Sequence, residues 1–77
     1  MEQLDLHGED RIGAKIKIKA FLNNNYRLGN RELAIIHGVG KGILKREVLD
    51  ILRHDKRVEE YNIDMFNGGC TLVKLKD

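Results

Sequence analysis

The sequence lacks several features that mark multidomain, secreted or membrane proteins. Its 77 residues include no proline and no serine- and glycine-rich linker, so residues 1–77 are predicted to form one small domain. Cys70 is the only cysteine and cannot form an internal disulfide, so we expect a reducing, cytoplasmic compartment. No apolar run approaches membrane-spanning length and no signal peptide precedes the first apolar segment, so no membrane partner is expected.

A strong charge of either sign is also absent. Hydrophobic residues make up 42% of the chain and charged residues 34%, which is typical of a soluble globular protein rather than a disordered one. The net charge of +2 is weak evidence for a polyanionic partner, and charge alone favours ordinary solvated helix faces. The distribution is more informative, because six cations lie in or near segments that flank glycine loops: Arg11, Lys15, Lys19, Lys41, Lys45 and Arg46.

Hydrophobic periodicity predicts an α/β fold in the order strand-helix-strand-helix-strand-strand. The predicted elements are strand 4–6, helix 11–25, strand 32–36, helix 43–54, strand 58–65 and strand 70–76. Residues 15–19 alternate as a strand would, but a segment this long without a turn signal favours a helix. Residues 23–25, three asparagines, are predicted to fray, with a cap at residues 29–30. Asn67-Gly68-Gly69 predicts the hairpin turn between the last two strands.

Segment 37–42, His-Gly-Val-Gly-Lys-Gly, lies between the second strand and the second helix. Its three alternating glycines leave the backbone open to a ligand, and the exposed amides of the following helix attract anions. Lys41 adds a mobile positive charge. A turn that merely needs glycine geometry explains the loop about as well. The spacing fits neither the Walker phosphate loop nor the dinucleotide-binding fingerprint.

Two histidines occupy matching positions. The apolar runs 4–6 and 33–36 each end in His-Gly, at His7 and His37. Strands joined through a helix are parallel with a right-handed crossover, so both histidines and the start of the second helix are expected at one edge of the sheet. Asp5 lies on the same face as His7 and could orient or charge an imidazole. A zinc site is not predicted, because these residues and the distant Cys70 lack ligand spacing.

Segment 4–8, L-D-L-H-G, followed by segment 37–42, H-G-V-G-K-G, resembles the small MutS-related (Smr) domain. That family is marked by L-D-L-H-G near its start and H-G-x-G-x-G in the middle, and both motifs are intact here. Segment 68–75, G-G-C-T-L-V-K-L, extends the resemblance over essentially the whole chain.

The resemblance implies a fold and a function. The family fold is a two-layer α/β sandwich of order βαβαββ, with a four-stranded mixed sheet and two helices, similar to the C-terminal domain of bacterial translation initiation factor three. Smr domains bind DNA or RNA, and several cleave it as endonucleases. In MutS-like ATPases the domain is linked to suppression of recombination and rescue of collided ribosomes. The motif match makes Asp5, His7 and His37 the expected catalytic set. Contacts to nucleic acid are expected from Gly8, Gly38, Gly40, Lys41, Gly42, Lys45 and Arg46.

Three function classes follow. The leading one is a monomeric nucleic-acid endonuclease, in which one imidazole acts as base and the other as acid. Asp5 would orient an imidazole or hold a divalent metal, Mg²⁺ or Mn²⁺. The second is a module that binds DNA, RNA or the ribosome without cutting, and the third is a protein-interaction domain. The only aromatics are Phe21, Tyr26, Tyr61 and Phe66, so no base-stacking platform is evident and backbone recognition is expected.

Overall fold

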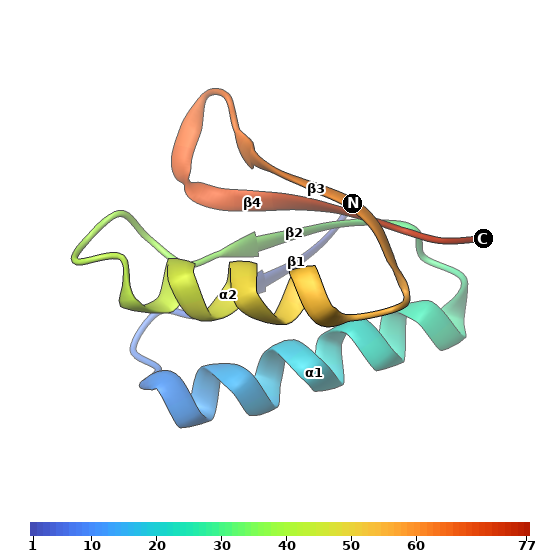
Figure 1. Cartoon of the computed structure of the whole chain (residues 1–77), viewed down its shortest axis with the longest axis horizontal. Coiled ribbons are helices and arrows are strands. Elements are labelled where there is room, and N and C mark those ends of the chain that lie inside the picture. Colours follow the sequence, from blue (N-terminus) through green and yellow to red (C-terminus); the bar gives the residue numbers. More distant parts are fainter.

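The computed structural model describes all 77 residues and has six elements in the predicted order. They are β1 (Glu2–Asp5), α1 (Arg11–Leu28), β2 (Glu32–Ile36), α2 (Ile43–His54), β3 (Val58–Asp64) and β4 (Asn67–Leu75). β1 and β2 are parallel, whereas β4 is antiparallel to both of its neighbours, which gives the sheet order β1-β2-β4-β3. Both helices cover the same face of the sheet (Figure 1). The predicted two-layer sandwich with a four-stranded mixed sheet is confirmed. Neither helix has the length and apolar character needed to cross a membrane.

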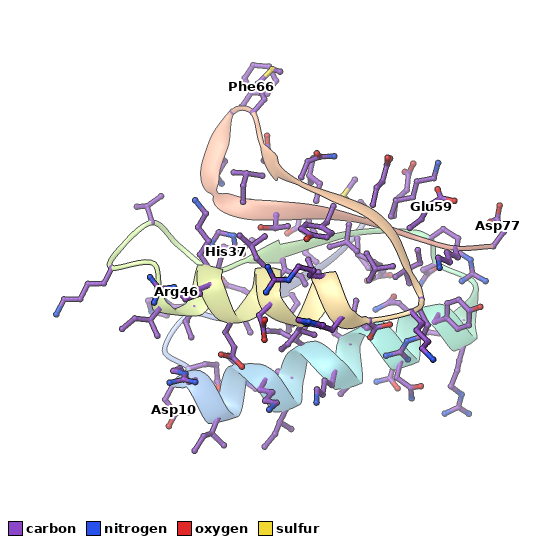
Figure 2. All side chains as sticks on the ribbon, viewed as in Figure 1. Asp10, His37, Arg46, Glu59, Phe66 and Asp77 are labelled. Atoms are coloured by element: carbon purple, nitrogen blue, oxygen red, sulfur yellow. The ribbon has the colours of Figure 1, made fainter.

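The core lies between the sheet and the helices, where side chains from both layers meet (Figure 2). Alternation in β4 turns Thr71, Val73 and Leu75 toward the helices, and all three are buried. Val48, Ile51 and Leu52 form the buried face of α2, with Leu44 at its margin. The core cluster consists of Leu6, Ala14, Ile18, Leu22, Leu33, Ile35, Val48, Ile51, Leu52, Val73 and Leu75.

α1 continues through the asparagines that the sequence predicts to fray. Asn25 is buried, where its side-chain amide donates to the Phe21 carbonyl at 2.9 Å and accepts from the Asn30 side chain at 2.9 Å. Gly29, with φ +85°, then ends the helix in the left-handed conformation that glycine adopts without strain. The predicted fraying is therefore wrong, because local hydrogen bonds to Phe21 and Asn30 satisfy the Asn25 side chain inside the helix, whereas the predicted cap is confirmed.

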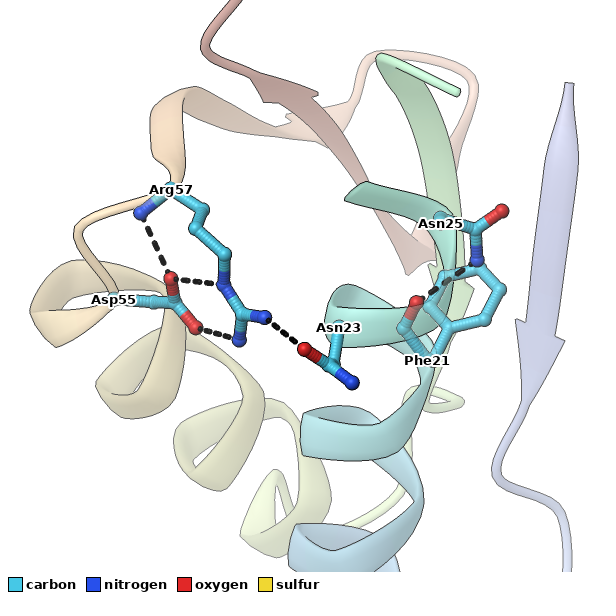
Figure 3. Close-up of polar contacts among 5 residues, drawn as sticks. All are labelled: Phe21, Asn23, Asn25, Asp55 and Arg57. Atoms are coloured by element: carbon cyan, nitrogen blue, oxygen red, sulfur yellow. Dashed lines mark hydrogen bonds and ion pairs between the residues drawn. The ribbon is translucent and has the colours of Figure 1, made fainter. Parts of the chain in front are cut away.

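A side-chain network at the same end of the molecule joins α1 to the turn between α2 and β3 (Figure 3). Arg57 donates from Nε and one terminal nitrogen to the carboxylate of Asp55, at 3.1 and 2.8 Å. Its other terminal nitrogen donates to Asn23 of α1 at 3.1 Å. The hydrogen bonds from Arg57 hold the pKa of Asp55 below its ordinary value, so this carboxylate stays ionised. The turn that follows α2 is thereby attached to α1.

The hairpin between β3 and β4 turns two residues earlier than predicted. Met65 and Phe66 form the turn, whereas Asn67, Gly68 and Gly69 belong to β4. Neither of these glycines has a positive φ. Gly69 instead packs against the backbone of Gly38, since a Cβ at Gly69 would lie 3.1 Å from the Gly38 Cα. The Asn-Gly-Gly signal is therefore wrong as a turn prediction, because one of its glycines is needed for a close contact between segments.

Candidate functional site

The two His-Gly turns lie at the same end of the molecule. Asp5 is the register partner of Ile36, and the Leu6 N–H donates to the Ile36 carbonyl at 2.9 Å, so β1 and β2 finish side by side. From this end the chain runs through one turn into α1 and through the glycine loop (residues 37–42) into α2 (Figure 1). The backbone is thus arranged as the parallel topology predicts, and the two imidazoles differ in what they do there.

The first turn presents His7 to solvent. The Leu6 carbonyl accepts from the Glu9 N–H at 3.0 Å, and Gly8 in the third position has φ +80°, as a type II turn requires. Asp5 accepts from the backbone N–H of His7 through Oδ1 at 2.9 Å. The Asp5 carboxylate therefore fixes the turn rather than the imidazole. His7 is exposed, and its ring has no hydrogen-bond partner within the protein.

The second turn buries its histidine. His37 is 9% exposed, with Nδ1 2.9 Å from the Gly38 carbonyl and Nε2 2.8 Å from the hydroxyl of the fully buried Thr71. A carbonyl only accepts, so Nδ1 carries a proton and donates to Gly38, which leaves Nε2 to pair with Thr71. Both ring nitrogens are engaged. Figure 2 labels His37 at the junction of β2 and the glycine loop.

β4 fastens the glycine loop to the sheet. The carbonyl of Gly69 accepts two backbone hydrogen bonds, from the His37 N–H at 2.8 Å and the Gly38 N–H at 3.0 Å. The sequence predicts no role at the site for either Gly69, which it places in the hairpin turn, or Thr71, although both lie in the third segment of the family resemblance. Their role depends on β4 lying next to β2, and no local pattern encodes that strand order.

The first turn of α2 has no side-chain cap. Its N-cap residue is Gly42, with φ +80°, and no side chain accepts from the amides of residues 43–45. Unpaired amides at a helix N-terminus carry a partial positive charge. α1 differs, because Asp10 caps it by accepting from the Gly13 N–H at 2.7 Å. Of the predicted binding residues, Gly38, Gly40 and Lys41 are exposed in the glycine loop, and Gly8 is exposed in the first turn.

A cavity of about 790 Å³ opens along α2 from Gly42, with Tyr61 of β3 on one side. Its cations include Arg11, Lys45, Arg46 and Arg53. Arg11 pairs with Glu47 at 3.6 Å and Arg53 with Asp50 at 3.1 Å. By contrast, Lys45 and Arg46 form no ion pair, and the same holds for Lys41 in the adjoining loop. Three unpaired cations therefore surround the uncapped start of α2.

No three His, Cys, Asp or Glu side chains gather where they could hold a metal ion. Asp5, the predicted ligand for Mg²⁺ or Mn²⁺, already accepts a backbone hydrogen bond through Oδ1. The side chains of this chain therefore do not form a complete metal site by themselves. Cys70 is a buried free thiol, and burial raises its pKa, which keeps it protonated and unreactive.

Comparison with known proteins identifies relatives of the whole chain. The profile of the Smr domain family matches residues 4–76. A protein named endonuclease MutS2 from Clostridium tetani is 32% identical over 77 residues, covering 96% of this chain and 10% of the relative. Endonuclease MutS2 from Clostridium kluyveri is 36% identical over 76 residues, covering 95% and 10%. The chain spans about a tenth of the length of these curated relatives.

Solved structures agree with this fold. The Smr domain of Thermus thermophilus MutS2 superposes with a TM-score of 0.94 at 31% identity, with both chains covered completely. YdaL, a stand-alone small MutS-related protein from Escherichia coli, superposes with a TM-score of 0.87 at 20% identity, covering 97% of this chain and 64% of YdaL. The likeness to YdaL concerns the fold alone.

Proposed function

The chain belongs to the Smr domain family, and from this membership we propose that it binds a DNA or RNA strand and cleaves a phosphodiester bond. The observation that carries the proposal is that two features lie at the same end of the molecule. One is the exposed imidazole of His7, and the other is the uncapped start of α2 with its three unpaired cations. The relatives named as endonucleases support the choice of reaction.

In this proposal the glycine loop and α2 hold the strand. The amides of residues 43–45 and the side chains of Lys41, Lys45 and Arg46 bind phosphate oxygens, and the bare backbone of Gly38 and Gly40 lets the strand approach closely. Gly8 has no side chain, so the first turn leaves room for the bound phosphate. These contacts reach the phosphate backbone and carry no direct sequence information.

His7 accepts the proton of the attacking water or 2′-hydroxyl, and the new P–O bond forms as the bond to the leaving oxygen breaks. Asp5 acts as a positioning residue, because its hydrogen bond to the His7 N–H holds the turn. His37 stays the predicted acid that protonates the leaving oxygen. That role requires Nε2 to carry a proton in addition to the one on Nδ1, and to leave Thr71 when the strand binds.

Supercoiled plasmid DNA and a structured RNA, each with and without Mg²⁺, test the reaction. The wild-type protein is expected to cut at least one of them, and His7→Ala to reduce the rate about 10²- to 10⁴-fold. His54→Ala is the matched control, because His54 is an exposed histidine at the opposite end of α2. Equal cleavage by the wild type and His7→Ala would contradict the mechanism.

A second function, binding without cleavage, is favoured by one observation. His37 has both ring nitrogens engaged, so only one free imidazole lies at this end. Binding should then be sensitive to salt while the nucleic acid stays intact. Lys45→Ala and Arg46→Ala are each expected to reduce the dependence of log K on log salt by about one unit. Lys56→Ala, which removes an equal charge from the turn after α2, should leave that dependence unchanged.

The wider roles of MutS-related proteins belong to the same proposal. We assign the domain to the cytoplasm, where it would act in DNA repair and recombination control or on RNA at the ribosome. Which of these roles the domain has depends on whether it binds DNA or RNA, and the cleavage and binding assays above distinguish the two.

A further inference from the structure

The hairpin between β3 and β4 projects from the body of the molecule and ends in two large apolar side chains. Met65 is 87% exposed and Phe66 is 93% exposed, and Figure 2 shows Phe66 pointing outward at the tip. Hairpin turns normally use glycine, asparagine or aspartate, because these residues adopt the positive φ angles that tight turns require. Two exposed apolar residues at this position do not serve the fold, since neither contacts the core.

The tip is held in a fixed conformation. Asp64 accepts from the Phe66 N–H through Oδ1 at 2.9 Å, on one side of the turn. Asn67 accepts from the Gly69 N–H through Oδ1 at 2.9 Å, on the other side. Phe66 is thus presented by two side-chain-to-backbone hydrogen bonds that flank the turn, which reduces the entropy lost when its ring contacts a ligand.

The same hairpin is fastened to the glycine loop. The Gly69 carbonyl accepts the two N–H groups at the start of that loop, and a Cβ at Gly68 would lie 4.0 Å from the side chain of Val39. Phe66 is three residues from Gly69, and a strand advances about 3.3 Å per residue, so the backbone of Phe66 lies within about 10 Å of the residue that holds the loop, and its ring points outward from there (Figure 2). The hairpin that carries the ring and the loop of the proposed phosphate site are therefore joined through Gly69.

An exposed ring at the tip of a hairpin attached to a phosphate-binding loop (Figure 2) has a specific chemical use. Every nucleobase has a flat π-face, and stacking on an aromatic side chain binds it without regard to sequence. Bases within a duplex already stack on each other, so the partner of a protruding ring is a base that is unpaired or that the ring unstacks. An aromatic residue that sequence analysis did not identify as a stacking platform thus acquires this role from its position.

We propose that Phe66 stacks on an unpaired base of the strand whose phosphate lies on the glycine loop, so that the domain prefers single-stranded or unpaired nucleic acid to a perfect duplex. Met65 packs against the edge of the same base. This inference rests on the proposed function, because it needs a bound strand. It adds a contact to a base where that proposal has contacts to phosphate alone.

Binding of a fluorescent single-stranded oligonucleotide and of the same sequence as a duplex tests the inference. Phe66→Ala is expected to weaken single-strand binding about 5- to 100-fold and to leave duplex binding unchanged. Leu28→Ala is the matched control, because Leu28 is another exposed apolar residue, at the far end of α1. Phe66 is exposed, so its replacement leaves the core intact, which thermal unfolding of the variant verifies.

A second variant reports stacking directly. The chain contains no tryptophan, so Phe66→Trp introduces a single reporter that keeps an aromatic face at the tip. It should retain wild-type affinity, and its emission should be quenched by the single strand and not by the duplex. Equal single-strand affinity of the wild type and Phe66→Ala, or an unquenched Phe66→Trp in the complex, would overturn the inference and leave the proposed function standing. A wild-type protein that binds neither oligonucleotide would overturn both.

Discussion

The two strand-to-helix turns of this domain begin with the same dipeptide, His-Gly, and end in opposite arrangements. In the first, His7 is exposed, and the helix that follows is capped by Asp10. In the second, His37 is buried, and the helix that follows has no side-chain cap. In the first turn the histidine is accessible and a helix amide is capped. In the second turn the histidine is buried and the helix amides are free to bind a ligand.

The difference shows that two copies of the same dipeptide can serve two functions, one in reaction and one in binding. Asp5 and Gly8 shape a tight turn whose corner is His7, a suitable place for a group that must reach a ligand. His37 instead follows β2 on the face toward the helices, where it meets Thr71. Its hydrogen bond to the Gly38 carbonyl then fixes the start of the glycine loop. The proposed division is a reactive turn beside a binding turn.

The largest change in stability that we expect distinguishes the two histidines, and measuring it in His37→Ala and His7→Ala tests the comparison. His37→Ala leaves the fully buried Thr71 hydroxyl without a partner, which costs about 1–3 kcal/mol, and the cavity adds to the loss. His7→Ala should change the free energy of unfolding by less than about 0.5 kcal/mol, because His7 is exposed. Urea denaturation measures both. Equal losses would mean that the two histidines are structurally equivalent.

Two glycines of the second turn provide a sharper pair. Gly42→Ala places a Cβ on a residue with φ +80°, which should destabilise the domain by about 1–2 kcal/mol. Gly40 has no positive φ and no atom within 4 Å of a built Cβ, so Gly40→Ala should be neutral or stabilising by about 0.4–1 kcal/mol.

The same pair separates folding from binding. If the bare backbone of the glycine loop holds phosphate, Gly40→Ala should weaken nucleic-acid binding although its melting temperature does not fall. Undiminished binding by this variant would show that the cations alone hold the strand, and that the glycines of the second turn serve its conformation.

Much of this arrangement is predictable from sequence because it depends on local pattern and on chain topology. The apolar run 33–36 places β2 correctly at residues 32–36, and helical spacing gives the bounds of α2. The parallel crossover places both His-Gly turns at one end. These inferences need only neighbours along the chain and the handedness of the connection.

The burial of His37 and the position of the hairpin turn could not be predicted in this way. Both depend on β4 lying beside β2, which brings Gly69 and Thr71 to the end of β2. An Asn-Gly-Gly segment is a turn signal by its local chemistry, and only the contact with Gly38 explains why it lies in a strand. The exposure of Phe66 follows from the same shift, since an earlier turn moves this ring to the tip.

The cap of α1 gives the smallest expected effect and tests the other half of the comparison. Asp10→Ala removes the acceptor of the Gly13 N–H and should cost about 1 kcal/mol in urea denaturation. Asp10→Asn keeps an oxygen that can accept the same bond and should retain most of the stability. Neither variant should lose affinity for nucleic acid, because the proposed phosphate site is at α2. If Asp10→Ala binds more tightly and Asp10→Asn does not, the freed amides of α1 have become a second anion site. The carboxylate of Asp10 would then be what distinguishes the two turns, since both helix starts would attract phosphate once uncapped.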